Sequence, residues 1–364
     1  MAEQSQAGAP EHGRISSIDA WRLVAVSMVI VGHIVAYSHP WFKEVIPGLV
    51  WRMAGMGTYG VLIFFCISGF VICRGLIREQ QSNARVSLRG FYIRRFFRIV
   101  PPLALYLLAV TVLSLCQWVP VRGVDLARSA TFLCNVKALG SCGWFLGHTW
   151  SLAYEEQFYV FFPLLFAAFL AHRRQGALTL TAAFMGLAML SWFSGHDDLA
   201  YAFQMFVFML CGCCAALYLD RFRAVTARIG PWTWAAVAVL TPAAMFWVVL
   251  PEPLHQFLLT MLVPPAVCVI VLCTPTQVAP VAAFFDNRRA AYLGKISFTV
   301  YLWQQLATAN YAWSTPWTAV PLVGIVWLFA HWSFAYFERP LIARGSALSN
   351  AASAPACAAA DSAL

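Results

Sequence analysis

Long apolar stretches alternate with short polar or Gly/Pro-containing segments along most of the chain. Each stretch is close to the length of about 20 residues that an α-helix needs to cross the hydrocarbon core of a membrane. About ten such stretches are present, and they lie at residues 21–38, 57–73, 99–119, 150–171, 177–193, 199–219, 232–250, 254–274, 291–312 and 317–337. The pattern predicts an all-α fold, a polytopic membrane helix bundle of about ten transmembrane helices.

The composition agrees with a membrane protein. Of 364 residues, 61% are hydrophobic and 11% are charged, and the mean hydropathy is +0.70. Soluble domains average about 45–50% apolar and about 25% charged residues, so an ordinary soluble domain and a disordered chain are both excluded. We expect one membrane domain over residues 14–344. Residues 1–13 lack the apolar core of a cleavable signal peptide and residues 345–364 are Ala/Ser-rich, so we expect both segments to be disordered.

Much of the formal net charge of +9 lies in one segment. Residues 74–98 contain seven arginines and a single acidic residue, Glu79. Between two apolar spans, such an excess is typical of a cytoplasmic loop rather than of a nucleic-acid site. When the spans alternate, the other basic connections fall on the same side, whereas residues 120–148, 194–198 and 251–253 are poorer in basic residues. We therefore predict that both termini are cytoplasmic and that nucleic acid is not a partner.

Most of the 11 cysteines lie within apolar spans, where cysteine behaves as a small hydrophobic residue. Cys211, Cys213 and Cys214 share one span without a nearby histidine, so packing explains them better than a metal site. Cys134 and Cys142 differ because both lie in the long connection before the fourth span. They either form a disulfide, if this connection faces an oxidising compartment, or remain as two free thiols.

Ionisable side chains within the first span suggest function, because charged groups in a membrane are costly. Asp19 and Arg22 are three residues apart at the cytoplasmic end and can pair on one helical face. His33 follows Arg22 by eleven residues, about 16 Å deeper. His33 is either a functional residue near the middle of the membrane or an interface histidine that bonds a backbone carbonyl.

The fourth predicted span contains two adjacent carboxylates, Glu155 and Glu156. If this span begins near His148, Glu155 lies about 10 Å inward, at a depth similar to that of His33. A carboxylate beside an imidazole can orient the ring as a general base for a hydroxyl group. The alternative is that one or both carboxylates pair with an arginine and stabilise the bundle.

Arginines also precede the third predicted span. Arg95 and Arg98 are three residues apart and share a helical face at the membrane surface. Guanidinium groups in such a pair suit phosphate oxygens. A cytosolic phosphate-bearing donor and a histidine halfway across the membrane together suggest group transfer through the membrane.

Six segments, taken in order, resemble the acyltransferase 3 family of integral-membrane O-acyltransferases. They are Ile18 to Arg22 with His33, Gly60 to Phe70, Phe91 to Arg98, Trp150 to Tyr159, Leu293 to Trp303, and Glu338 to Pro340. The resemblance implies transfer of an acyl group, usually acetyl, from cytosolic acyl-CoA to a hydroxyl of a cell-surface glycan or lipid-linked saccharide, such as a lipopolysaccharide O-antigen or an exopolysaccharide. It also implies a multi-pass protein of the bacterial inner membrane.

The resemblance assigns roles to individual residues of this chain. Arg22, Arg95 and Arg98 match the donor-binding motifs, and His33 matches the catalytic histidine. Ser68 and Gly69 match a second-span motif that lets backbone approach the donor, although close helix packing explains small residues equally well. Beyond the resemblance, the similar depth of Glu155 and His33 leads us to expect that Glu155 joins His33 in catalysis, and we expect Asp19, Glu156, Trp150 and Tyr301 as supporting residues. Many relatives have a histidine where this chain has Gln304. Because this second histidine is absent here, we assign the proton transfer to His33.

We expect acyl-CoA to act as a co-substrate, with no permanently bound cofactor and no metal. The main alternative is a proton-coupled transporter of an anionic sugar or organic acid, because a His and a Glu within the membrane also suit a carrier. The absence of an internal repeat between the two halves of the sequence, and the clustering of basic residues on one side, favour the transferase.

Overall fold

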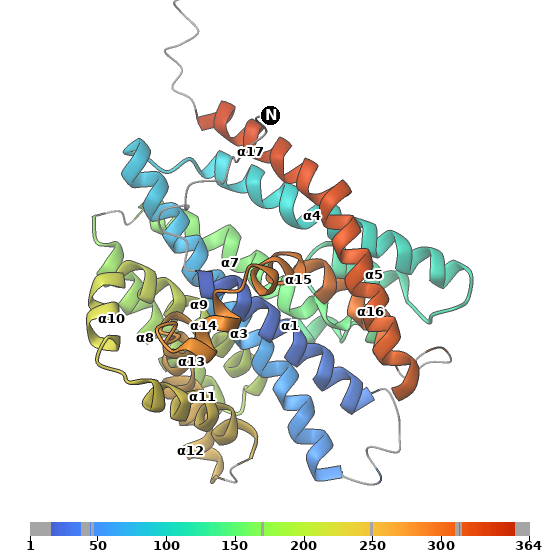
Figure 1. Ribbon diagram of the computed structural model, residues 1–364, viewed down its shortest axis with the longest axis horizontal. Helices are drawn as coiled ribbons and strands as arrows, with labels where there is room; N and C mark the ends of the chain where they lie inside the picture. Colours follow the sequence, from blue (N-terminus) through green and yellow to red (C-terminus); the bar gives the residue numbers. More distant parts are fainter. Residues whose placement is uncertain are drawn as a thin grey trace, which may run out of the picture.

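The computed structural model describes residues 16–37, 44, 47–168, 171–247, 250–309, 313 and 315–353. Over these residues the regular structure is entirely helical, which confirms the predicted fold class. Figure 1 shows the helices gathered into one bundle, with α1 (Ser16–Tyr37) and α3 (Pro47–Asn83) near its middle. Residues 1–13, which were predicted to be disordered, lie outside the described residues.

Helices occupy every predicted span. Besides α1 and α3 they are α4 (Leu88–Leu115), α7 (Thr149–Ala168), α8 (Arg173–Phe193), α9 (Asp197–Leu217), α11 (Pro231–Phe246), α12 (Glu252–Phe257) continuing through η2 (Leu258–Leu262) into α13 (Val263–Leu272), α15 (Arg288–Ala307), and α16 (Pro316–Ser333) with η3 (Phe334–Glu338). In the described part of the chain, seven helices are long and apolar enough to cross a membrane. The number becomes eight if α10 (Leu219–Thr226) and α11, which are bent by 106°, form one span. The chain is therefore a multi-pass helical bundle. The number of ten spans and the cytoplasmic location of both termini stay predictions.

The arginine-rich segment is a helical hairpin rather than a loop. α3 contains 37 residues, so it is about 55 Å long and exceeds a hydrocarbon core of about 30 Å. Residues 84–87 join it to α4, where the Ser87 hydroxyl accepts a hydrogen bond from the Gly90 amide at 3.1 Å. Glu79 of α3 pairs with Arg94 of α4 at 2.7 Å and holds the two arms together.

Two glycines allow helices to cross in close contact. A Cβ atom on Gly69 would lie 1.9 Å from the Met209 carbonyl oxygen, and one on Gly294 would lie 1.7 Å from the Asp19 carbonyl oxygen. Only a residue without a side chain permits these approaches of α3 to α9 and of α15 to α1. The two contacts fix the positions of the helices that carry the candidate site.

The chain continues beyond the predicted domain boundary as a helix. α17 (Arg339–Ser353) follows η3 directly and packs along α4, as the upper part of Figure 1 shows. The predicted disorder is therefore wrong for residues 345–353, while residues 354–364 lie outside the described residues. Gly345 explains the close packing, because a Cβ there would lie 2.7 Å from the Phe97 side chain. Small Ala and Ser side chains thus support a helix contact here rather than disorder.

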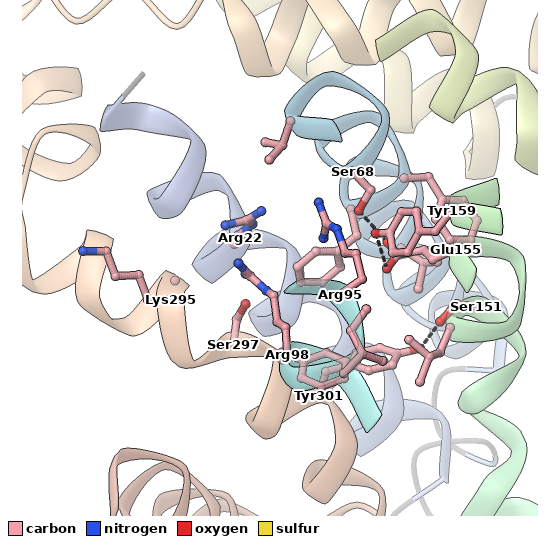
Figure 2. A pocket seen from close by; sticks show the side chains of 18 residues that line it. Arg22, Ser68, Arg95, Arg98, Ser151, Glu155, Tyr159, Lys295, Ser297 and Tyr301 are labelled. Carbon is pink, nitrogen blue, oxygen red and sulfur yellow. Dashed lines mark hydrogen bonds between the residues drawn. The ribbon is translucent and has the colours of Figure 1, made fainter. Parts of the chain in front are cut away.

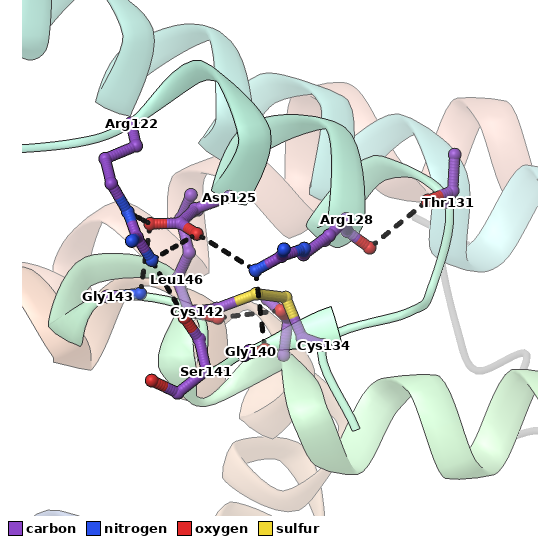
Figure 3. A network of polar contacts seen from close by, with 11 residues as sticks. Arg122, Asp125, Arg128, Thr131, Cys134, Gly140, Ser141, Cys142, Gly143 and Leu146 are labelled. Carbon is purple, nitrogen blue, oxygen red and sulfur yellow. Dashed lines mark hydrogen bonds and ion pairs between the residues drawn. A yellow bond between two sulfur atoms is a disulfide. The ribbon is translucent and has the colours of Figure 1, made fainter. Parts of the chain in front are cut away.

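The connection between α4 and α7 is a compact structure held by a disulfide. It contains α5 (Gly123–Ala130), η1 (Lys137–Leu139) and α6 (Trp144–Gly147). Of the two alternatives for Cys134 and Cys142, the structure has the disulfide. Beside it, Arg122 forms two hydrogen bonds of 2.8 Å to the carboxylate of Asp125, which also accepts from the Gly143 amide (Figure 3). The hydrogen bonds from Arg122 lower the pKa of the Asp125 carboxyl group.

Candidate functional site

A cavity lies among α1, α3, α4, α7 and α15, on the side of the membrane predicted to be cytoplasmic. Its polar lining brings together six of the predicted site residues, as Figure 2 shows: Arg22, Ser68, Arg95, Arg98, Glu155 and Tyr301. Ser151, Tyr159, Lys295 and Ser297 also line it. Residues from five helices, distant in sequence, therefore meet around one space.

Three arginines make this cavity suitable for an anion. Arg22 pairs with Asp19 at 3.1 Å, as predicted from their spacing. Arg95 lies over the ring of Tyr159, with its guanidinium carbon 4.8 Å from the ring centre. Arg98 makes neither a hydrogen bond nor an ion pair with any described residue, and it stays accessible through the cavity. The amine of Lys295 points away from the arginines (Figure 2). A guanidinium group without a protein acceptor is a binding group for phosphate or carboxylate.

Glu155 belongs to this cavity and not to the environment of His33. One carboxylate oxygen accepts a hydrogen bond from the Ser68 hydroxyl at 2.7 Å, and the other accepts from the Tyr159 hydroxyl at 3.1 Å. Both donors also line the cavity. The carboxylate therefore fixes the wall that faces the arginines. Neither Glu155 nor Glu156 forms an ion pair with an arginine of the described residues. The alternative that one of these carboxylates stabilises the bundle by pairing with an arginine is therefore not supported.

His33 instead contacts Gln304 of α15. The Nδ1 atom of His33 lies 3.0 Å from the Oε1 atom of Gln304. The Gln304 amide nitrogen donates to Gln305 at 3.0 Å, so the Gln304 oxygen faces the imidazole, and Nδ1 must carry the proton. The lone pair of the neutral ring then lies on Nε2. Nε2 can act as a general base.

The predicted contact between His33 and Glu155 is therefore wrong, and the error lies in the assumed starting depth of the fourth span. His148, which was taken as the outer edge, already lies at the level of His33. Its carbonyl accepts from the Tyr301 hydroxyl at 2.9 Å. Trp144, one turn earlier, places its ring 5.4 Å from that of His33. Glu155 lies seven residues further along, about 10 Å nearer the predicted cytoplasmic side.

Tyr301 connects the two levels. It lines the inner end of the cavity, and its hydroxyl lies 2.7 Å from the Ser151 hydroxyl. One helical turn further along α15 is Gln304, the partner of His33. The arginine-lined cavity and the histidine are thus neighbouring layers of one site.

Other predicted residues have packing roles. Gly69 lies against Met209 of α9 and is not among the residues that line the cavity, which favours the packing alternative, while its donor-binding role stays a prediction. Trp150 packs its ring against Phe65 and Tyr201 at 6.2 and 6.1 Å between centres. The Oε1 atom of Glu156 is buried without a hydrogen-bond partner in the described residues.

Sequence reasoning missed three side chains of this site. It treated Gln304 as the loss of a histidine, although Gln304 is the partner of His33. It did not assign Tyr159 to Glu155 or Ser151 to Tyr301. The available signal was the polar character of these residues within apolar helices, which often marks a functional site.

The fold and the cavity define a multi-pass helical membrane protein with an arginine-lined cavity inside the helix bundle. A family model described as an acyltransferase domain, Acyl_transf_3, matches residues 15–338. The chain therefore belongs to the acyltransferase 3 family, as the resemblance of its motifs indicated.

Individual relatives agree with this membership. The chain is 25% identical to Peptidoglycan O-acetyltransferase OatA of Listeria monocytogenes, over 91% of this chain and 56% of that protein. It is 26% identical to Putative membrane-bound transacylase BcsY of Komagataeibacter xylinus, over 82% of this chain and 74% of that protein. The chain thus spans about half the length of OatA. No solved structure matches it.

Proposed function

We propose that the protein transfers an acyl group, normally acetyl, from cytosolic acyl-CoA to a hydroxyl group of a cell-surface glycan or lipid-linked saccharide. The observation that carries this proposal is Arg98, an arginine without an acceptor among the described residues, in a cavity that ends one helical turn from the partner of His33. Arg22, Arg95 and Arg98 bind phosphate groups of the donor. The thioester end points toward Tyr301 and the His33 layer.

In the proposed reaction His33 is the general base. Its Nε2 atom takes the proton of the acceptor hydroxyl while that oxygen attacks the thioester carbonyl carbon. The carbon–sulfur bond breaks, and the imidazolium returns the proton to the departing thiolate. The products are an ester of the acceptor and free CoA. The hydrogen bond from Nδ1 to Gln304 keeps the tautomer that this step needs.

Glu155 has a positioning role in this proposal. Its two hydrogen bonds hold Ser68 and Tyr159 on the wall beside Arg95. Its negative charge also balances part of the positive charge of the three arginines, which lowers the repulsion among them. It does not orient His33.

The names of the relatives support the acceptor class. OatA is named for O-acetylation of peptidoglycan, and BcsY is named a putative membrane-bound transacylase. We propose a carbohydrate hydroxyl as the acceptor and the bacterial inner membrane as the location, because cytosolic donor and surface acceptor meet there.

The test measures ester-linked acetyl groups on envelope polysaccharides by mass spectrometry. Host cells carry the wild-type protein, no protein, His33→Ala, Arg98→Gln or Arg221→Gln. Arg221 is exposed on α10 and does not line the cavity. Acetylation at the full level is expected with the wild type and with Arg221→Gln only, and Arg98→Gln should give a reduced level. A general base contributes about 10²–10⁴-fold, so His33→Ala should fall to background.

Binding of acetyl-CoA to the purified variants separates the two roles. His33→Ala should bind acetyl-CoA as the wild type does, whereas Arg98→Gln should bind it about tenfold more weakly, because a charge-assisted hydrogen bond is lost. A membrane-inserted His33→Ala protein that still acetylates polysaccharide would refute the base assignment. A wild-type protein that does not bind acetyl-CoA but moves sugars or organic acids across vesicles would be a transporter.

A further inference from the structure

A continuous chain of hydrogen bonds leads from His33 to the disulfide-held connection between α4 and α7. The Nδ1 atom of His33 lies 3.0 Å from the Oε1 atom of Gln304, and the Gln304 amide nitrogen donates to the Oε1 atom of Gln305 at 3.0 Å. The Gln305 amide nitrogen in turn donates to the backbone carbonyl of Trp144, in α6, at 2.9 Å. Gln304 and Gln305 are 0% and 2% exposed, so bulk water does not compete for these hydrogen bonds. A residue of the outer connection is therefore linked to His33.

The Trp144 carbonyl fixes the direction of each hydrogen bond in this chain. The amide group of a glutamine side chain can turn and exchange its oxygen and nitrogen, whereas a backbone carbonyl can only accept a hydrogen bond. The Gln305 nitrogen must therefore face Trp144, and the Gln305 oxygen faces Gln304. The Gln304 nitrogen must then face Gln305, which leaves the Gln304 oxygen toward His33. The proton on Nδ1 of His33 is thus set by Trp144, through two side-chain amides.

A second described neighbour of the Gln304 amide does not fix its orientation. The Thr308 hydroxyl lies 3.1 Å from the Gln304 Oε1 atom and 3.0 Å from the Gln304 backbone carbonyl oxygen. A hydroxyl group can both donate and accept, so Thr308 tolerates either orientation of the amide. Among the described residues, Gln305 therefore decides which atom of Gln304 meets His33.

Trp144 is held in place from two sides. Its indole nitrogen Nε1 donates to the backbone carbonyl of Gln305 at 3.2 Å, so two hydrogen bonds join Trp144 and Gln305. On its other side, Cys142 lies two residues before Trp144 and forms the disulfide with Cys134. The amide of Gly143, between them, donates to the Asp125 carboxylate at 3.3 Å (Figure 3). The position of the Trp144 carbonyl therefore depends on the fold of the outer connection.

We propose that Gln305 is a positioning residue for proton transfer, which connects the Trp144 carbonyl to Gln304 and so keeps the proton of neutral His33 on Nδ1. The disulfide-held connection is thereby a part of the site. The inference rests on the proposed function where it concerns catalysis, whereas the tautomer exists without any substrate. When the chain is intact, Nε2 keeps the lone pair that receives the proton of the acceptor hydroxyl. When Gln305 is replaced by an apolar residue, the Gln304 amide can turn, and the ring can carry its proton on either nitrogen.

The experiment measures the tautomer of His33 by nitrogen NMR of the full-length protein, labelled with ¹⁵N-histidine and placed in phosphatidylcholine nanodiscs. A ring nitrogen that carries a proton and one that carries a lone pair have different chemical shifts. The spectrum of His33→Ala identifies the His33 signals among those of the eight histidines. At about pH 8, where an ordinary imidazole is neutral, we expect the wild-type protein to carry the His33 proton on Nδ1.

Two variants of Gln305 separate its chemistry from its size. Gln305→Leu should give a mixture of tautomers and lower kcat about two- to tenfold, the factor that corresponds to one neutral hydrogen bond, with unchanged affinity for acetyl-CoA. Gln305→Glu should keep the proton on Nδ1, because a carboxyl oxygen accepts from Gln304 in either protonation state. The control is Gln204→Leu, which removes a buried glutamine of α9 whose amide nitrogen donates to Thr260 at 2.8 Å. It should leave the tautomer and kcat as in the wild type.

A cysteine variant tests the outer end of the chain. Replacement of both Cys134 and Cys142 by serine removes the disulfide beside Trp144, so it should give a mixture of tautomers and lower kcat within the same about two- to tenfold range. Cys116→Ser changes an exposed free thiol at the end of α4 and should change neither quantity. A double variant that keeps both the Nδ1 proton and full kcat would overturn the role of the outer connection.

The outcomes separate this proposal from the proposed function. A wild-type His33 with its proton on Nε2 would overturn the proposal, whether or not the variants fold. A folded Gln305→Leu protein that keeps the proton on Nδ1 would also overturn it. Both results would leave acetylation and acetyl-CoA binding by the wild type as they are. A wild type with the proton on Nδ1 that neither binds acetyl-CoA nor acetylates polysaccharide would overturn the proposed function, and with it the catalytic role of Gln305, but not the hydrogen-bonded chain.

Discussion

At the scale of single residues, the partner of a side chain determines its chemistry. His33 and Glu155 are both polar groups within membrane helices, but they belong to different layers. His33 donates to an amide oxygen, which places the lone pair on Nε2. Glu155 accepts from two hydroxyl groups and faces arginines. The two residues therefore have separate tasks, proton transfer for one and organisation of the donor site for the other.

The hydrogen bond of Gln304 to His33 leads to a kinetic prediction. Gln304→Leu removes the acceptor of the Nδ1 proton, so the ring no longer prefers the tautomer with a basic Nε2. We expect kcat to fall about tenfold or more, with unchanged acetyl-CoA affinity, in assays with the purified protein. Gln256→Leu makes the same change on α12 outside the cavity and should leave kcat at the wild-type value. A Gln304→Leu enzyme with full kcat would contradict the tautomer argument.

Asp125 predicts a dependence of stability on pH. Its carboxyl pKa is lowered in the folded protein by hydrogen bonds from Arg122, so the ionised form contributes stability above the unfolded pKa of about 3.9. This contribution is lost as the pH falls through the lower, folded pKa. We expect Asp125→Asn to lower the midpoint of thermal unfolding by about 2–4 °C at pH 7, and the difference from wild type to shrink below about pH 4.

Thermal unfolding of the detergent-solubilised protein at pH 7 and at pH 3 measures this effect. Asp198, which pairs with Lys137 and is 61% exposed, provides the control. Asp198→Asn should change the midpoint little at either pH, because exposed pairs contribute little. If the unfolding midpoint of Asp125→Asn is below that of the wild type by the same amount at both pH values, the charge of the Asp125 carboxylate does not stabilise the connection between α4 and α7.

At the scale of helices, the closest approaches occur where glycine faces backbone. Helices in a membrane gain little from the hydrophobic effect when they associate, so close packing and hydrogen bonds hold them together. Gly69 meets the Met209 carbonyl, and Gly294 meets that of Asp19. The second contact holds α15, with Tyr301 and Gln304, against α1, with Arg22 and His33. The geometry of the site thus depends on these crossings.

Gly69 and Gly186 form a matched pair for testing this packing. An added methyl group on Gly69 would meet the Met209 carbonyl oxygen at 1.9 Å, whereas one on Gly186 of α8 would meet nothing within 4 Å. We expect Gly69→Ala to destabilise the protein by about 1–3 kcal/mol through overpacking. Gly186→Ala should be neutral or stabilising by up to about 1 kcal/mol, since alanine is the better helix former.

Unfolding midpoints and membrane yields of the two variants measure the difference. Binding of acetyl-CoA to Gly69→Ala, at a temperature where it is folded, should match the wild type. Weaker binding with unchanged stability would instead support the donor-binding role that the sequence predicts for Gly69.

At the scale of the whole molecule, charge and covalent structure distinguish the two ends of the bundle. The arginine-rich hairpin of α3 and α4 and helix α17 lie at one end. The disulfide between Cys134 and Cys142 lies in the connection that follows α4. Arginine excess is typical of the cytoplasmic side, while disulfides form in oxidising compartments. Both features predict the same orientation, with the donor cavity toward the cytoplasm.

Labelling of single cysteines in intact cells tests this orientation. Cys116 is an exposed thiol at the end of α4 away from the arginine-rich hairpin, and a membrane-impermeant maleimide should label it from outside. Ser82→Cys, in the hairpin and in a Cys116→Ser background, should react only after the membrane is permeabilised. Labelling of Ser82→Cys in intact cells would contradict the predicted orientation, because the arginines would then lie on the side of the membrane away from cytosolic acyl-CoA.

Local properties of the sequence determined the fold class and much of the chemistry. Apolar stretches of membrane-spanning length predicted a helix at each position, because in lipid each segment must satisfy its own backbone hydrogen bonds. The spacing of Asp19 and Arg22 predicted their ion pair, and the motifs identified the family. These properties depend on neighbours along the chain.

Tertiary structure alone decided which polar groups meet. His33 and Gln304 are separated by 271 residues, and Ser68 and Glu155 by 87. Depth counted along single helices misplaced Glu155, because an error in the starting level of a span shifts each of its side chains by that amount. The Ala/Ser-rich sequence of α17 likewise did not predict that this helix packs against α4. Such contacts depend on how helices cross and how deeply each one begins, and packing of the whole bundle sets both.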